Sequence, residues 1–95
     1  MSNHAITYSV EVEGGEKVLK INAINYPYLA TIEDNPDIMS FVLLRLIEDP
    51  MINSIEIEQE ETISYHSNAV DILKDFATVY VKIKGILSSY YQFLL

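Results

Sequence analysis

Acidic residues gather in one short stretch of this chain, at Glu56, Glu58, Glu60 and Glu61. Carboxylate oxygens are the ligands that calcium and magnesium prefer, so a hard-metal site is the first chemistry to consider. However, the stretch alternates apolar and polar residues like a half-buried strand, which places Glu56 and Glu58 on its outward face, and a turn follows. We therefore interpret these glutamates as a solvated face that also discourages edge-to-edge strand pairing, and we predict no metal ligands.

Residues for acid–base or phosphate chemistry are sparse. The only histidines are His4, near the N-terminus, and His66, at the end of a predicted strand. A catalytic pair would need an orienting carboxylate beside them, so a local hydrogen bond is the simpler role for His66. Gly14-Gly15 lacks the Lys-Ser/Thr of a phosphate-binding loop. We predict neither catalytic residues nor a cofactor, and hence no enzyme.

Arg45 is the one basic residue within a strongly apolar segment. Two roles remain open for it. It could be a cation that faces a partner or a phosphate. Alternatively, its stem is buried and its guanidinium reaches Glu48, Asp49 or a carboxylate at the sheet edge.

The composition excludes several classes of partner. The chain has 95 residues, a net charge of −8 and only six basic residues, which are scattered along it. Nucleic acids and anionic membranes are therefore poor partners, because binding phosphates needs clustered Lys or Arg. There is no cysteine, and no N-terminal signal segment is visible. The apolar stretch from Ile83 to Leu95 is too short for a membrane span, so we expect a cytoplasmic chain without direct membrane insertion.

The first half of the chain predicts a β-hairpin and a helix. Residues Ile6 to Val12 alternate like a strand, and Lys17 to Ile24 return as a second strand after a two-glycine turn. A helix is expected from Pro36 to Glu48, because Asn35 is a good N-cap and proline fits the first helical position. Asp49-Pro50 ends it.

The second half predicts another hairpin and a long helix. Residues Ile52 to Glu58 alternate like a strand, and Thr62 to His66 are expected to form the second strand of the hairpin. Asn68 then caps a helix with an apolar stripe that extends over more than twenty residues. The order β-β-α-β-β-α predicts an α+β two-layer sandwich, with an antiparallel four-stranded sheet and two helices on one face. We expect residues 1–95 to form a single domain.

The last helix is too long for so small a domain. From Asn68 to Leu95 it would run about 40 Å, whereas a domain of this size is only about 30 Å across. Either the helix breaks at Gly85 and folds back, or its end packs on protein that is absent from this chain; we favour the second alternative. The predicted interface then comprises Tyr90, Tyr91, Phe93 and Leu94, with Arg45 as a secondary contact.

A longer pattern resembles the N-terminal region of archaeal type II/IV secretion system ATPases, the hexameric motors of archaeal pili and related secretion machines. The resemblance extends from about Val18 to Tyr80 and is most specific at Ile32-Glu33-Asp34-Asn35-Pro36-x-x-Met39 and Leu46-Ile47-Glu48. It also includes the following positions: Leu19-x-Ile21-Asn22, Pro27, Ile55-x-Ile57-x-Gln59, Tyr65, Ile72-Leu73 and Ala77-x-x-Tyr80.

The resemblance implies a non-catalytic docking or regulatory domain at the start of a longer ATPase. The family's nucleotide chemistry belongs to a separate core domain whose phosphate-binding loop this chain lacks, so no catalytic residue is carried over. The resemblance implies that the domain contacts the ATPase core or a neighbouring subunit of a homo-oligomer. It also implies a membrane platform protein as a partner, which would hold the domain at the membrane periphery. Two alternatives remain: a standalone acidic module of the inhibitor or immunity kind, which binds a basic protein, and a small-molecule sensor.

Overall fold

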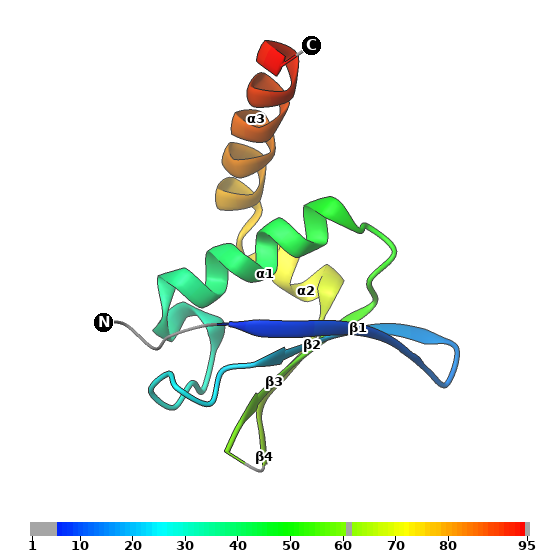
Figure 1. Cartoon of the computed structure of the whole chain (residues 1–95), viewed down its shortest axis with the longest axis vertical. Helices are drawn as coiled ribbons and strands as arrows, with labels where there is room; N and C mark the ends of the chain where they lie inside the picture. Colours follow the sequence, from blue (N-terminus) through cyan, green and yellow to red (C-terminus); the bar gives the residue numbers. More distant parts are fainter. Residues whose placement is uncertain (1–5, 61, 95) are drawn as a thin grey trace.

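The computed structural model describes residues 6–60 and 62–94, without the side chains of residues 90, 91, 93 and 94. Four strands form one sheet in the order β1-β2-β3-β4, and the helices α1 and α2 cover one face of it (Figure 1). The elements are β1 (Thr7–Glu13), β2 (Glu16–Asn22), a short 3-10 helix η1 (Ile32–Asp34), α1 (Pro36–Glu48), β3 (Ser54–Gln59), β4 (Thr62–Asn68), α2 (Ala69–Asp75) and α3 (Ala77–Leu94). The predicted α+β architecture with helices on one face is confirmed.

The first hairpin closes through a two-residue turn. Gly14 and Gly15 have φ angles of 58° and 81°, which glycine adopts without steric cost. Glu13 lies opposite Glu16, and the register continues to Thr7 opposite Asn22. β1 is therefore an edge strand along its whole length.

The helix α1 begins and ends where the sequence predicts. The Asn35 side chain accepts hydrogen bonds from the backbone N–H groups of Asp37 and Ile38, and Pro36 opens the first turn. The helix ends at Glu48, with Asp49 as its C-cap.

The prediction of a wholly antiparallel sheet was wrong, because β2 and β3 run parallel, with Val18 opposite Ser54 and Asn22 opposite Glu58. The physical reason is the length of α1. Its 13 residues span about 20 Å, which matches the length of a strand of six or seven residues. The helix thus returns the chain to the end of the sheet where β2 began, and β3 starts there in the same direction. The two hairpins are joined into a mixed sheet.

The core lies between the sheet and the helices. Leu19 and Ile21 of β2 and Ile55 and Ile57 of β3 are at most 1% exposed. They belong to one buried cluster that also contains Leu29 and Ile32. The helices α1 and α2 contribute the following residues to this cluster: Ile38, Val42, Leu43, Leu46, Ala69 and Ile72. This explains why α1 is apolar on nearly all sides, since it covers the sheet and is itself contacted by other segments.

The predicted long helix is two helices. α2 ends at Asp75, and its C-cap Phe76 leaves the helical region with a φ of −120° and a ψ of 29°. α3 begins at Ala77. Figure 1 shows α2 lying on the sheet while α3 projects away from it. The less favoured alternative, a break at Gly85, does not occur, because α3 runs through this residue. The backbone stays hydrogen-bonded across the junction, from Phe76 N–H to the Ile72 carbonyl and from Tyr80 N–H to the Phe76 carbonyl.

Gln59 fixes the connection between β2 and α1. The residue is only 6% exposed, and its Oε1 accepts a hydrogen bond of 2.8 Å from the Leu29 N–H. Its amide nitrogen lies 2.8 Å from the Pro27 carbonyl oxygen, 3.1 Å from that of Tyr26 and 3.3 Å from that of Ala23. One buried side chain thus satisfies backbone groups of an irregular segment that has no ladder of its own.

An ion pair links the start of β2 to the end of α1. Lys17 Nζ lies 2.5 Å from a carboxylate oxygen of Asp49. This hydrogen bond, helped by the Met51 backbone N–H, lowers the pKa of Asp49 below its ordinary value of 3.8. The ionised form of Asp49 therefore favours the folded state, and this contribution is lost as the pH falls through the lowered pKa.

We expect the stability of the Lys17→Met variant to fall less in acid than that of the wild-type chain. The wild-type chain should lose stability below about pH 4 more steeply than the variant, because the variant no longer lowers the pKa of Asp49. Urea unfolding midpoints between about pH 6 and about pH 3 measure this difference. Lys82→Met, at an exposed position of α3, is the control. If this control reduced the pH dependence of stability as much as Lys17→Met does, the effect would not come from the Lys17–Asp49 ion pair.

Candidate functional site

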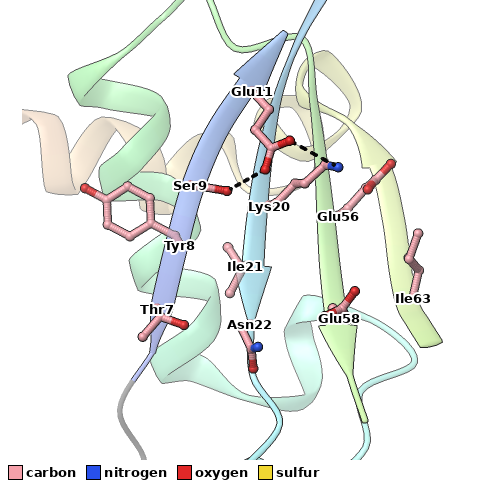
Figure 2. Close-up of a pocket in the computed structure, with 10 residues that line it drawn as sticks. All are labelled: Thr7, Tyr8, Ser9, Glu11, Lys20, Ile21, Asn22, Glu56, Glu58 and Ile63. Atoms are coloured by element: carbon pink, nitrogen blue, oxygen red, sulfur yellow. Dashed lines mark hydrogen bonds and ion pairs between the residues drawn. The ribbon is translucent and has the colours of Figure 1, made fainter. Parts of the chain in front are cut away.

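The face of the sheet that the helices leave open is polar and hollowed. Figure 2 shows the residues that line this hollow, which come from the strands β1, β2, β3 and β4. The volume of the hollow is about 500 Å³. Its polar lining side chains come from alternate positions of the strands: Thr7, Ser9, Glu11, Lys20, Asn22, Glu56 and Glu58. The strand register sets Ser9, Lys20, Glu56 and His66 in one row across the sheet. The predicted outward placement of Glu56 and Glu58 is confirmed.

Lys20 is surrounded by carboxylates on this face. Its Nζ lies 2.5 Å from Glu13 and 3.6 Å from Glu11. The hydrogen bond to Glu13 and the charges of Glu11 and Glu56 raise the pKa of Lys20 above its ordinary value. The cation is thus already paired within the chain, and the face as a whole is acidic, which suits a basic partner better than an anionic ligand.

The described residues that were considered for metal or acid–base chemistry lie at separate places in the sheet and its turn. His66 lies opposite Glu56 in the sheet, whereas His4 and Glu61 lie outside the described residues. Glu60 occupies the turn with a φ of 58°. Among the residues that the structure describes, no group of three or more His, Asp or Glu side chains could hold a metal ion.

Arg45 is engaged within its own chain. Its Nη2 lies 2.5 Å from Glu48, and its Nη1 donates to the Tyr8 hydroxyl at 3.2 Å. The guanidinium carbon lies 5.2 Å from the centre of the Tyr8 ring and 4.9 Å from that of Phe41. This geometry matches the second of its two possible roles, and it fastens β1 to α1. A contact between Arg45 and a partner stays a prediction.

The helix α3 carries an apolar stripe that is partly buried and partly exposed. Its stripe begins at Val79, Tyr80 and Ile83, which are partly buried against the core. One turn further, Ile86 lies on the same stripe and is 60% exposed. Val81, on the opposite side of the helix, is 66% exposed. Beyond Ile83, Ile86 is exposed, whereas Leu87 is partly buried and lies outside the core cluster.

The predicted interface residues Tyr90, Tyr91, Phe93 and Leu94 occupy the last turns of α3. Their side chains lie outside the described residues, so the interface predicted from them stays a prediction. Within the described part of the chain, no helix combines the length and the apolarity that crossing a membrane requires.

The motif that carries the family resemblance has a local structural explanation. Thr31 and Asp34 form a capping box around η1, and Ile32 is fully buried. Asn35 then caps α1, and Pro36 starts it. Each of these residues shapes the entry to α1, so the motif accounts for a turn in the fold and marks no binding site by itself.

Comparison with known proteins adds no relative: no family model, no curated protein and no solved structure matches this chain.

The sequence did not predict the hollow of the open face or the central position of Lys20 in it. The alternation of β1 and of β3 placed their glutamates on an outer face, but the position of Lys20 between them follows from the parallel pairing of β2 with β3. A better signal was the length of α1, which returns the chain to the same end of the sheet.

Proposed function

We propose that this chain is a non-catalytic docking module whose helix α3 packs against an apolar helix of a partner protein. One observation carries the proposal: the apolar stripe of α3 starts against the core and continues with Ile86 past the body of the domain, where it is exposed. An apolar stripe of this kind is normally covered by another protein surface.

The charge of α3 indicates the chemistry of its partner. The helix contains Lys82 and Lys84 and no acidic residue, although the chain as a whole carries a net charge of −8. The complementary surface is an apolar helix flanked by carboxylates. The resemblance suggests a more specific partner. In that case the partner helix belongs to the core or to a neighbouring subunit of a secretion or pilus-assembly ATPase. The module would then couple that motor, in the cytoplasm, to a membrane platform protein.

A matched pair of substitutions tests the use of α3. Ile86→Asp puts a charge on the stripe, and Val81→Asp puts the same charge on an equally exposed position of the opposite side. We expect Ile86→Asp to weaken partner binding at least about tenfold, because it buries an unpaired carboxylate in an apolar contact. Val81→Asp should change it less than about twofold.

The open reading frame that encodes this chain indicates which partner to use in this test. If the reading frame continues past Leu95 into a phosphate-binding loop, the pair of variants is made in the longer protein, and its assembly and ATP turnover are measured. Equal effects of the two substitutions would contradict docking through the stripe.

A second function is favoured by the open face. The carboxylates of Glu11, Glu13, Glu56 and Glu58 leave this face acidic around one lysine, which suits an inhibitor or immunity-like module that binds a basic protein. A reading frame that stops at Leu95 would favour this function. Its binding would weaken with salt, and Ile86→Asp would not affect it.

A further inference from the structure

The edge strand β1 carries an unusual combination of features. All seven of its residues are exposed. Tyr8, Val10 and Val12 lie on one face and are 46%, 38% and 73% exposed. Thr7, Ser9, Glu11 and Glu13 alternate with them on the open face of the sheet. A long, exposed strand with an apolar face is a template for pairing with another strand.

The hairpin turn determines which backbone groups are free. In a hairpin with a two-residue turn, the flanking residues, here Glu13 and Glu16, exchange both of their hydrogen bonds. Thr7, Ser9 and Glu11 then point their backbone groups inward to β2 as well. The N–H and C=O groups of Tyr8, Val10 and Val12 point outward, and no described residue pairs with that edge.

We propose that β1 pairs antiparallel with β1 of a second copy of this chain, across a two-fold axis at Val10, so that the two sheets become one. This register overlaps the whole strand and joins all three outward-facing residues of each copy. Val10 then meets Val10, and Tyr8 meets Val12, in pairs of the aromatic and β-branched kind that stabilise sheets.

The charges on the other face favour the same register. Glu11 lies opposite Ser9 of the second copy, and Glu13 lies opposite Thr7, so each carboxylate faces a hydroxyl. Shifting the pairing by two residues toward the turn would set Glu11 against itself, which is unfavourable. The register centred on Val10 thus overlaps the whole strand and sets no carboxylate against another, which favours a second copy as the occupant of this edge. This pairing does not involve α3 and is independent of the function proposed above.

Single cysteines test the register, since the chain contains no cysteine of its own. Val10→Cys places two thiols opposite each other, at the separation of about 5.5 Å that a disulfide accepts. Val12→Cys, the control, places them several residues apart. In oxidised glutathione, we expect Val10→Cys to form a disulfide-linked dimer at least about tenfold faster than Val12→Cys.

Opposite charges at the axis give a second measurement. Val10→Lys and Val10→Glu should each be monomeric in sedimentation, whereas an equimolar mixture should form a heterodimer. Circular dichroism checks that both variants are folded, and the unmodified chain should show a monomer–dimer equilibrium that Ile86→Asp leaves unchanged. Equal cross-linking at positions 10 and 12, or an unmodified chain that stays monomeric at high concentration, would overturn the proposal.

Discussion

Gln59→Leu is expected to destabilise the fold by about 3 kcal/mol, although it replaces one buried side chain by another of similar volume. The leucine cannot accept the hydrogen bond of the Leu29 N–H, and it leaves the carbonyl oxygen of Pro27 without the Gln59 donor. These groups belong to the connection between β2 and α1, which has no other ladder to satisfy them. Urea unfolding followed by circular dichroism measures the loss.

Gln59→Glu separates hydrogen bonding from packing. The carboxylate keeps the shape of the side chain but turns the donor toward Pro27 into a charged acceptor, so we expect a similar loss at neutral pH. Protonation restores one donor, and the deficit relative to the wild-type chain should therefore shrink as the pH falls. Gln92→Leu, at an exposed position of α3, is the control and should stay within about 0.5 kcal/mol. A Gln59→Leu chain as stable as this control would show that the segment does not depend on Gln59.

Leu19→Ala is expected to lower the free energy of unfolding by about 3 kcal/mol, because it opens a cavity between the sheet and the helices. Leu19 is fully buried in β2, between β1 and β3, and belongs to the core cluster. For a domain of this size such a loss is a large part of the total stability. Thermal and urea unfolding of the isolated chain measure it.

Leu87→Ala is the matched control, with the same deletion of atoms on α3. Leu87 is only partly buried and lies one turn beyond Ile83, outside the core cluster. Alanine also favours helix at least as well as leucine, so the change should cost less than about 0.5 kcal/mol. A large loss at Leu87 would show that the isolated domain already covers this part of α3, which would contradict docking through it.

Local signals in the sequence predicted most elements. The two-glycine turn, the Asn35-Pro36 start of α1 and the alternation of β1 and β3 each depend on neighbouring residues, and the structure confirms them. The Asn68 cap is also confirmed, since its side chain accepts from the Val70 N–H.

Features that depend on the whole fold were not predictable in the same way. The direction of β3 relative to β2 follows from the return path of α1, which no local pattern encodes. The break at Phe76 involves neither glycine nor proline, and it arises where α2 leaves the sheet. The role of Gln59 was hidden for the same reason, because its partners lie about thirty residues earlier in the chain.

Because α3 leaves the domain at the Phe76 junction, hydrogen exchange in this helix should report whether a partner is bound along it. Only the first turns of this helix rest on the domain, so the amide protons beyond Ile86 are sheltered by a few helical turns that would be marginal in isolation. Their exchange with deuterium should be fast in the free chain and slow markedly once another helix lies along the stripe. The same amides would stay fast if two copies joined only through their sheets.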